Sequence, residues 1–311
     1  MNSPSGPTLG QLRAFRAVAE FLHFGRAARE LGMSQSALSA ALASCEDALG
    51  GRLVERTTRR VMLTALGADL LPSAERALTA IDELVLRSGE NRAPFTGRLR
   101  LGLIPTIAPY LLPRTLAMLQ KAHPDLEPTV QEDRTAPLLE ALGAGKLDLL
   151  VLATPSPGLV ELPLYDEDFV LAVPADHPLA GREGLEPAVL REVDVLLLTG
   201  GHCLREQAVD LCRAAGADPQ AVSRAGSLTT LVQLVAAGMG VTVLPETALE
   251  LESRRSRLGT ARFARPAPGR RITLVHRPGD PHAAEYAVLA EEVRRMARVR
   301  RLPVQLVDVE V

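Results

Sequence analysis

The segment FGRAARELGMSQSALSAAL, residues 24–42, predicts two short helices joined by a tight turn. Gly32 can end the first helix as a C-terminal cap, and Ser34 can accept a hydrogen bond at the start of the second. Two helices joined in this way are typical of a helix–turn–helix, whose second helix enters the major groove of double-stranded DNA. Short polar side chains that can reach base edges and phosphates stand near the start of that helix: Ser34, Gln35, Ser36 and Ser39.

The sequence on either side completes a small domain over residues 1–67. Residues 9–22 predict an amphipathic helix, and Cys45 falls on the apolar stripe of the helix that begins after Ser34. Two short extended stretches follow, and their basic side chains would track the DNA backbone from a β-wing: Arg56, Arg59 and Arg60. A plain three-helix bundle with solvated polar ends is the alternative.

A long helix and a linker come next in the chain. The helix is expected to run from Thr64 to about Arg87, and Pro72 in its interior should bend it. The segment SGENRAPFTG, residues 88–97, is polar and contains glycine and proline, so it predicts a linker.

From Arg98 onward the pattern changes to strands that alternate with helices. Apolar runs such as 99–104 and 147–153 predict strands, and segments such as 109–121 and 204–215 predict helices between them. This alternation indicates an α/β fold with largely parallel strands. Because the region is large for one such sheet, we expect two α/β subdomains with a cleft between them.

The net charge of −2 is unevenly distributed along the 311 residues. Residues 1–67 hold eight arginines and five acidic residues, a net charge of +3, which leaves −5 for the remainder. The asymmetry favours an N-terminal domain that faces an anion. Aromatic residues make up only 3% and tryptophan is absent, which argues against a base-stacking platform for single-stranded nucleic acid.

Composition also excludes several other classes of protein. Three cysteines are too few for a secreted disulfide scaffold, and the N-terminal residues do not resemble a signal peptide. No stretch approaches the roughly 18 unbroken apolar residues of a membrane span, so we expect a cytoplasmic protein with no membrane partner. The six histidines are scattered and there is no CxxC pair, so we expect neither a metal site nor a cofactor.

Cys203 and Cys212 differ from Cys45 in their context. Cys203 follows a predicted strand and opens a predicted helix, with His202 and Arg205 beside it, and all of these features favour a thiolate. Cys212 lies nine residues later, which on a helix is about 13 Å and half a revolution away. A disulfide needs Cα atoms within about 7 Å, so the two could bond only if the helix unwound. Taken alone, Cys212 fits an ordinary core residue better than a redox-active one, because free cysteines are so often buried.

The chain resembles the LysR-type transcriptional regulators in two N-terminal segments, residues 24–42 and ALGGRLVERTTRRVMLTALG (48–67). A long helix and an α/β remainder follow, so the resemblance covers essentially the whole chain. The resemblance implies a winged helix–turn–helix over 1–67, a dimerising linker helix and hinge over 68–97, and a regulatory domain over 98–311. That domain would consist of two α/β subdomains and resemble periplasmic binding proteins. The implied partners are promoter DNA, RNA polymerase and further copies of the chain in a homotetramer, a dimer of dimers.

Three further segments are similar to the peroxide-sensing members of that family: GHCLREQA (201–208), GLIPTIAPYLLP (102–113) and GRRITLVHRPG (269–279). The similarity implies that hydrogen peroxide oxidises Cys203 and that Cys212 then forms a disulfide with it. It also implies a set of residues that bind and orient the peroxide: Thr106, Thr135, His202 and Arg271.

Two other functions remain open from the sequence. A LysR-type regulator could respond instead to a small anion or metabolite bound between the two subdomains. A thiol peroxidase on an α/β scaffold would use the same cysteine chemistry, although residues 1–67 would then have no purpose. The sequence contains neither a GxSxG elbow nor a GxGxxG segment after a predicted strand, so neither motif indicates a different enzyme.

Overall fold

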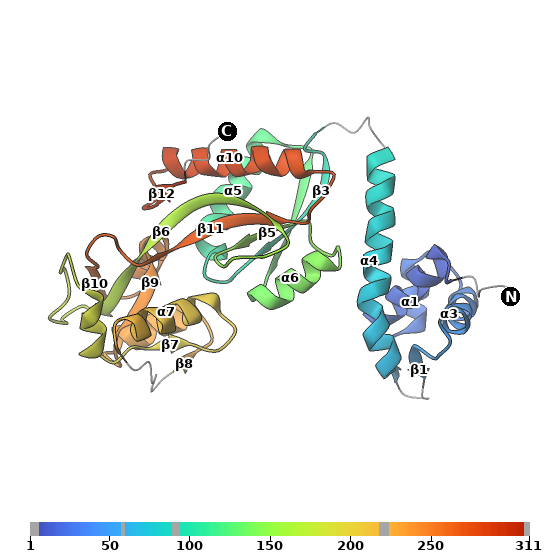
Figure 1. Ribbon diagram of the computed structural model, residues 1–311, viewed down its shortest axis with the longest axis horizontal. Coiled ribbons are helices and arrows are strands. Elements are labelled where there is room, and N and C mark those ends of the chain that lie inside the picture. The colour runs from blue at the N-terminus through green and yellow to red at the C-terminus, as the bar shows by residue number, and fades with distance from the viewer. Residues whose placement is uncertain (1–5, 57–59, 89–93, 218–223, 308–311) are drawn as a thin grey trace. The chain divides into compact units, whose positions relative to one another are not determined.

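The computed structural model describes residues 6–56, 60–88, 94–217 and 224–307 (Figure 1). The chain separates into two compact units. The first contains Met1–Asn91 together with Gly143–Gly145, and the second contains Arg92–Leu142 and Lys146–Val311.

The first unit is a small helical domain with a two-stranded wing. Its elements are α1 (Leu9–Phe21), α2 (Phe24–Glu30), α3 (Gln35–Leu49), β1 (Val54–Arg56), β2 (Val61–Leu63) and α4 (Ala65–Ser88). The strands β1 and β2 pair in antiparallel fashion, as a wing requires. This is the winged helix–turn–helix that the sequence predicts, and α4 is the long helix, with Pro72 in its interior. The expected linker lies partly outside the described residues.

Local capping explains where these helices begin. The Ser34 hydroxyl accepts a hydrogen bond from the backbone N–H of Ala37 at 3.2 Å, so Ser34 is the N-cap of α3. At α4, Thr64 Oγ1 accepts from the N–H of Gly67 at 2.9 Å and donates to the carbonyl of Arg52 at 2.7 Å. Thr64 therefore starts α4 and ties it to the wing.

The core of the first unit is formed by the apolar faces of α1, α2 and α3. Phe15, Leu38 and Cys45 are fully buried there. Burial, followed by the charge of Glu46, raises the pKa of the Cys45 thiol. The prediction that Cys45 is a core residue is confirmed.

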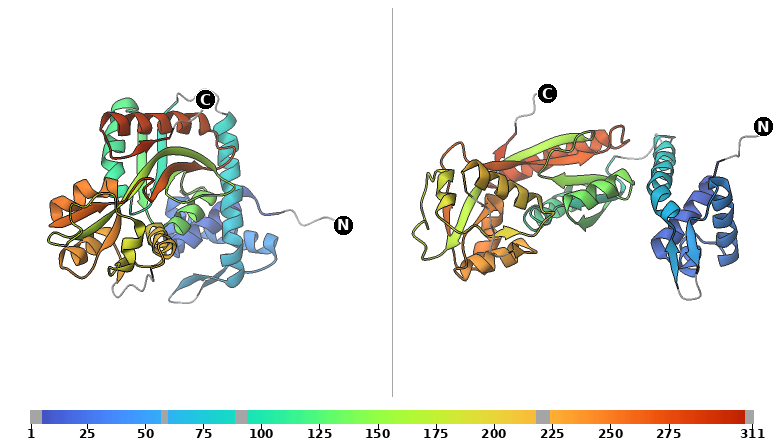
Figure 2. Two further views of the ribbon diagram at one scale, coloured as in Figure 1. Left: turned by 60° about the vertical axis from the view of Figure 1, so that its left-hand side comes forward. Right: turned by 60° about the horizontal axis from the view of Figure 1, so that its bottom comes forward.

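The second unit is an α/β domain built on a mixed, curved sheet (Figures 1 and 2). Its main strands are β3 (Gly97–Leu103), β4 (Leu126–Glu132), β5 (Leu149–Leu152), β6 (Val160–Pro174), β9 (Thr242–Pro245), β10 (Leu258–Arg262), β11 (Gly269–His276) and β12 (Gln305–Leu306). The order along the sheet is β10-β6-β11-β5-β3-β4, with β9 and β12 also paired to β6. The strands β7 (Leu197–Leu198) and β8 (Arg224–Ala225) form a separate parallel pair.

The expectation of largely parallel strands is wrong. In the main sheet β3 is parallel to β4 and β5, whereas every pairing of β6 and β11 is antiparallel. An apolar run in the sequence reports that a strand is buried but carries no information about its direction. The α/β class itself is confirmed.

Helices cover the sheet and divide the interior into two cores. They are α5 (Ala108–Ala122), α6 (Thr135–Gly143), α7 (Cys203–Ala214), α8 (Leu228–Ala236), α9 (Leu249–Arg255) and α10 (Ala283–Val299), with 3-10 turns η1 (Pro187–Arg191) and η2 (Glu246–Ala248). One apolar cluster packs β3, β5 and β11 against α5 and α10. The other surrounds β9, α7 and α8. Strand β6 contributes to both clusters, because its first part pairs with β11 and its last part with β9 and β10.

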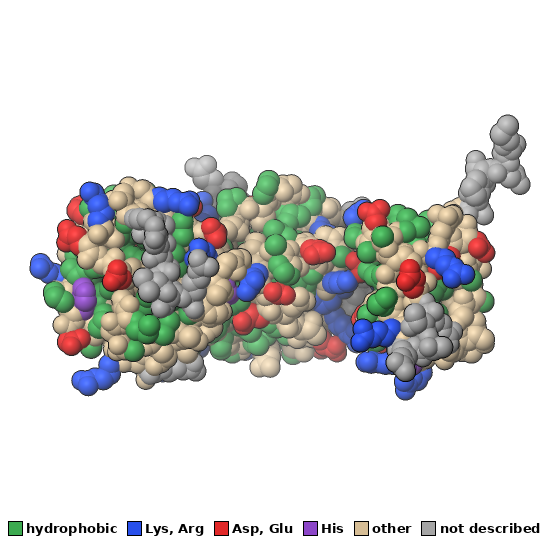
Figure 3. All heavy atoms as spheres, turned by 90° about the horizontal axis from the view of Figure 1, so that it is seen from below, with side chains coloured by type: hydrophobic (Ala, Val, Ile, Leu, Met, Phe, Trp, Pro, Cys, Tyr) green, Lys and Arg blue, Asp and Glu red, His purple; other side chains and the backbone are tan. Residues whose placement is uncertain are grey.

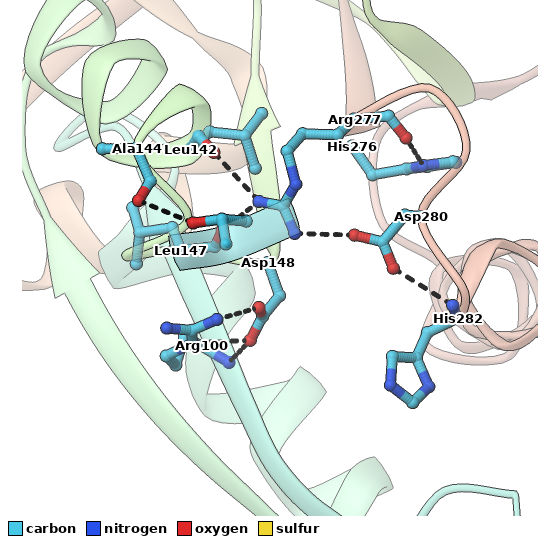
Figure 4. A network of polar contacts seen from close by, with 10 residues as sticks. Arg100, Leu142, Ala144, Leu147, Asp148, His276, Arg277, Asp280 and His282 are labelled. Atoms are coloured by element: carbon cyan, nitrogen blue, oxygen red, sulfur yellow. Dashed lines mark hydrogen bonds and ion pairs between the residues drawn. The ribbon is translucent and has the colours of Figure 1, made fainter. Parts of the chain in front are cut away.

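A half-buried arginine, Arg277, fixes the loop between α6 and β5 (Figure 4). Arg277 donates through Nη1 to the carbonyls of Leu142 and Leu147, at 2.9 and 2.7 Å, and through Nη2 to Asp280 at 2.8 Å. The other carboxylate oxygen of Asp280 accepts from the N–H of His282 at 3.1 Å. Because Arg277 satisfies the carbonyl of Leu142 in the last turn of α6 and that of Leu147 just before β5, it holds this loop against the end of β11.

Within the described ranges, we find no helix that combines the length and the apolar character needed to cross a membrane.

Replacing Arg277 by leucine is expected to destabilise the second unit by about 3 kcal/mol, because it leaves the buried carboxylate of Asp280 without its cation. The measurement is the midpoint of urea unfolding, followed by circular dichroism. The matched control is Arg271→Leu, which breaks an exposed ion pair with Asp166 and should cost less than about 1 kcal/mol. Equal shifts in the two variants would contradict this account.

Candidate functional site

Two separate surfaces carry the residues that the sequence analysis selected. The first is the start of α3. Gln35 and Ser36 are exposed and Ser39 is half-buried. Gln35 and Ser39 are one turn apart and therefore lie on the same side of α3. The Ser34 hydroxyl, which caps the helix, also lies 3.0 Å from the Ser36 hydroxyl. The start of α3 thus presents amide and hydroxyl groups to the solvent.

Basic residues accompany this surface on the wing. Arg56 ends β1, and the side chain of Arg60 is exposed just before β2. Arg59 lies outside the described residues. Figure 3 shows basic side chains gathered on one face of the first unit.

The second surface surrounds Cys203, at the first residue of α7. Gly201, with a φ of +88°, turns the chain after β7, and His202 becomes the N-cap of α7. Cys203 is 7% exposed and belongs to the first core, whereas Cys212 is fully buried and belongs to the second. Both thiols are free. Since α7 is continuous from Cys203 to Ala214, its geometry keeps the two cysteines about 13 Å apart.

An arginine that the sequence analysis did not select lies beside this thiol. Arg270 donates through Nη1 to the hydroxyl of Thr106 at 2.9 Å and through Nη2 to the carbonyl of Thr106 at 3.0 Å. The hydroxyl of Thr106 also acts on Cys203, because it is one of the hydrogen-bonding groups that lower the pKa of the thiol. The structure therefore places Thr106 beside Cys203.

Arg271, which was expected to line the same pocket, does not do so. Its side chain is exposed and forms two 2.8 Å hydrogen bonds with the carboxylate of Asp166. Successive side chains of a strand point to opposite faces of the sheet, so only one of the two adjacent arginines of β11 can face the core. The expected position is corrected by one residue, from Arg271 to Arg270.

The environment of Cys203 also differs from the expectation of a thiolate. Burial raises the pKa of the Cys203 thiol; the charge of Arg270, the Thr106 hydroxyl and the backbone N–H groups at the start of α7 lower it, but burial prevails. Arg270, and not Arg205, is the charge that acts on this thiol; Arg205 donates to the carbonyl of Leu198 at 3.1 Å.

His202 does not supply a positive charge either. Burial, and after it the charge of Arg134, lowers the pKa of His202, so the imidazole is neutral at pH 7. Its Nδ1 atom has no hydrogen-bond partner, and the ring forms a hydrogen bond with the backbone of Gly226. The ring therefore donates from Nε2 and leaves Nδ1 as an acceptor.

Among the described residues, several buried polar atoms near the start of α7 lack a partner. They are His202 Nδ1 at the N-cap of α7 and Gln207 Oε1 on α7, together with Thr135 Oγ1 and Thr154 Oγ1, which directly follow Arg134 and Ala153, the residues that contact Gly201 and Gln207. Thr135 opens α6, and its neighbour Arg134 lies against Gly201. Buried polar atoms are normally paired, so such a cluster fits a small polar ligand that would complete their hydrogen bonds.

Gln207 is a second residue that the sequence analysis missed. It lies one turn after Cys203, and its Nε2 donates to the carbonyl of Ala153 at the end of β5, at 2.8 Å. The signal that could have found it is a polar amide one turn after Cys203, next to the buried apolar residue Ala208.

No group of three or more potential ligands among histidine, cysteine, aspartate and glutamate is placed to hold a metal ion in the described parts of the chain.

Comparison with known proteins identifies both units. Residues 9–68 match the family model described as bacterial regulatory helix-turn-helix protein, lysR family. Residues 92–298 match the LysR substrate binding domain. Together the two models cover most of the chain.

Similar proteins match this chain over nearly its whole length. A "probable hydrogen peroxide-inducible genes activator" from Streptomyces viridosporus is 54% identical over 305 residues, which are 97% of this chain and 97% of that protein. The "DNA-binding transcriptional dual regulator OxyR" of Escherichia coli K12 is 42% identical over 280 residues, 89% of this chain and 92% of that protein.

Solved structures agree with the sequence comparison. A full-length OxyR from Pseudomonas aeruginosa, with one cysteine replaced by aspartate, is 30% identical and gives a TM-score of 0.79, covering 93% of this chain and 98% of that one. A hydrogen peroxide-bound OxyR from Corynebacterium glutamicum, with one cysteine replaced by serine, is 44% identical with a TM-score of 0.64, covering 95% of this chain and 96% of that one. On these grounds the chain belongs to the LysR family of bacterial regulatory proteins and is similar over nearly its whole length to the OxyR proteins within it.

Proposed function

We propose that this protein is a DNA-binding transcriptional regulator that senses hydrogen peroxide through Cys203 and controls oxidative-stress genes. One observation carries the proposal: α7 holds Cys203 beside a cluster of unpaired buried polar atoms and holds Cys212 in a different core. Oxidation that joins the two thiols cannot leave this helix intact. A chemical signal is thereby converted into a conformational one.

The chemistry at Cys203 begins with peroxide held among the polar groups around the thiol. Thr106 donates a hydrogen bond to the sulfur, and His202 Nδ1 can accept a peroxide proton. The hydroxyl of Thr135 and the amide oxygen of Gln207 can complete the binding of the second oxygen. Arg270 takes the role that the sequence analysis gave to Arg271.

The reaction proceeds in two balanced steps. The sulfur of Cys203 attacks one peroxide oxygen, the O–O bond breaks, and the other oxygen leaves with the thiol proton as water, which gives a sulfenic acid. The Cys212 thiol then attacks that sulfur, the S–O bond breaks, and a second water leaves as the disulfide forms. Peroxide is reduced and two thiols are oxidised.

The first unit would supply the DNA contacts. Gln35, Ser36 and Ser39 would read bases from α3, Ser34 would contact a phosphate, and the arginines of the wing would follow the backbone. Because it would act on promoters, we expect a cytoplasmic protein that contacts RNA polymerase. We infer a homotetramer built as a dimer of dimers, with α4 as the dimerising helix, and domain limits of 1–67, 68–97 and 98–311. Unwinding of α7 would re-angle the DNA-binding units of this assembly.

We infer that the protein is a sensor and not an enzyme. A thiol peroxidase would turn over peroxide continuously with a thiol reductant, whereas a sensor consumes about one peroxide per reduced subunit. A regulator triggered by a small metabolite would still respond in a Cys203→Ser variant. Steady-state peroxide consumption and DNA footprints of that variant separate the three functions.

A brief peroxide pulse is expected to join Cys203 and Cys212 in a disulfide while Cys45 stays a free thiol. The Cys212→Ser variant should stop at the sulfenic acid of Cys203, and Cys203→Ser should form no disulfide. Mass spectrometry after trapping of free thiols and sulfenic acid gives the readout. Oxidation of Cys45 or Cys212 ahead of Cys203 would refute the assignment.

The alkylation of reduced Cys203 by a neutral reagent should accelerate with pH. Because burial raises the pKa of this thiol, the protonated form predominates at neutral pH and the rate should climb about tenfold per pH unit through pH 8. Arg270→Gln removes the cation that opposes burial and should slow the reaction further at each pH. A rate that is already level at pH 6 would show that the resting residue is a thiolate.

DNA binding should weaken steeply with salt. If a dimer contacts about eight phosphates, the slope of log K against log salt concentration should be about −7. Gln35→Ala should change sequence preference, whereas Arg59→Ala and Arg60→Ala should weaken all sites alike. Fluorescence anisotropy with specific and scrambled duplexes measures both effects, and a flat salt response would contradict the winged-helix interface.

A further inference from the structure

We propose that Glu167 is a positioning residue for Cys203, which it controls through Arg270 and Thr106. Glu167 lies on β6 directly opposite Arg270 of β11 in the register of the two strands. Its Oε1 atom is 2.7 Å from Arg270 Nε, and both side chains are only 1% exposed. Arg270 belongs to the peroxide site proposed above, whereas Glu167 was given no part in that chemistry.

The direction of each hydrogen bond follows from the chemistry of the groups. A guanidinium can only donate, so the Thr106 hydroxyl oxygen must accept from Arg270 Nη1. The single hydroxyl proton of Thr106 is then free to be donated to the sulfur of Cys203. Glu167 holds Nε, and because the guanidinium is planar, that contact determines where Nη1 and Nη2 point. The orientation of the Thr106 hydroxyl toward the thiol thus depends on Glu167.

Glu167 is itself held from its other side. Thr247, in η2, donates its hydroxyl to Glu167 Oε2 at 2.5 Å. Glu167 also stands on β6 just before the strand changes partner: Glu167 pairs with Arg270 of β11, whereas Phe169 pairs with Pro245 of β9. One buried carboxylate therefore links the strands of the first core to η2 and to the thiol.

The negative charge of Glu167 also offsets the positive charge that reaches Cys203. Arg270 is the cation whose charge lowers the pKa of the Cys203 thiol, and Glu167 is its ion-pair partner. Two other arginines near the start of α7 have different partners. The charge of Arg134 lowers the pKa of His202, and Arg205 Nε lies 3.8 Å from Glu206 Oε1. Glu167 therefore restrains the ionisation of the resting thiol through Arg270.

The inference rests on the proposed function only because it concerns the same thiol. Alkylation of Cys203 in the reduced protein, measured as a function of pH, requires neither peroxide nor DNA. If the protein does not sense hydrogen peroxide, the alkylation rate of Cys203 is unaffected. The proposed function and the proposed role of Glu167 can therefore fail independently.

The test is the Glu167→Gln variant of the full-length chain, alkylated with iodoacetamide and analysed cysteine by cysteine by mass spectrometry. The amide keeps an oxygen for Arg270 Nε but removes the charge. We expect the pKa of Cys203 to fall by about half to one unit, which makes alkylation at pH 7 about three- to tenfold faster. Cys45 and Cys212 should remain slow, which shows that the variant is folded.

The neighbouring variant Asp166→Asn is the matched control. It removes the same charge one residue away on the same strand, but Asp166 is paired with the exposed Arg271. Its Cys203 profile should coincide with that of the unmodified protein. If Asp166→Asn and Glu167→Gln change the profile equally, the effect is one of net charge and the proposal is overturned.

A double-mutant cycle tests whether Glu167 acts through Arg270. In the Arg270→Gln background, Glu167→Gln should change the alkylation profile by less than about twofold. An undiminished effect in that background would overturn the proposed route. If either glutamine variant fails to fold, Glu167→Asp keeps the charge but shortens the side chain, draws Arg270 away from Thr106, and should slow alkylation of Cys203. An unchanged profile in a folded Glu167→Asp variant would also overturn the proposal.

Discussion

The buried ion pair between Glu167 and Arg270 is the interaction on which the geometry around Cys203 depends. A charge removed from water is costly unless its hydrogen bonds are also satisfied, and here the two side chains are bound on several sides. Arg270 engages both polar atoms of Thr106, and Glu167 receives the hydroxyl of Thr247. Such a pair contributes more to fixing positions than to stability. Its position determines how the loop before α5 meets the first turn of α7.

Helix α7 connects that site to the rest of the second unit. Its first residue packs in one core and its middle packs in the other, so the helix is held at both places in the reduced protein. Bringing Cys212 to Cys203 would require Cys212 to leave a fully buried position. The apolar packing that Cys212 would give up in that movement is comparable to that of a small buried hydrophobic residue. A disulfide between the two sulfurs, as proposed, would have to compensate for this loss.

Much of this arrangement could be predicted from the sequence, and the exceptions have physical causes. The caps at Ser34 and Thr64 and the apolar stripe through Cys45 are local features, which a short window of sequence contains. The choice between Arg270 and Arg271 depends on which face of β11 is buried, and two adjacent arginines do not reveal it. The contribution of Glu167 depends on pairing between strands about a hundred residues apart. The direction of the strands, and the neutral state of His202, likewise arise only when distant segments come together.

The burial of Cys45 has a consequence for how an oxidising signal is read. That thiol is enclosed in the core of the winged helix–turn–helix and is kept protonated by its surroundings, so oxidants have little access to the part of the molecule that faces DNA. Cys212 is shielded in the same way by the second core. Within the part of the chain that the structure describes, Cys203 is the one thiol of the three that has unpaired buried polar atoms on its own helix turn, His202 Nδ1 and Gln207 Oε1. If peroxide reacts at Cys203 as proposed, the first unit takes no direct part in that reaction, because its one cysteine is buried.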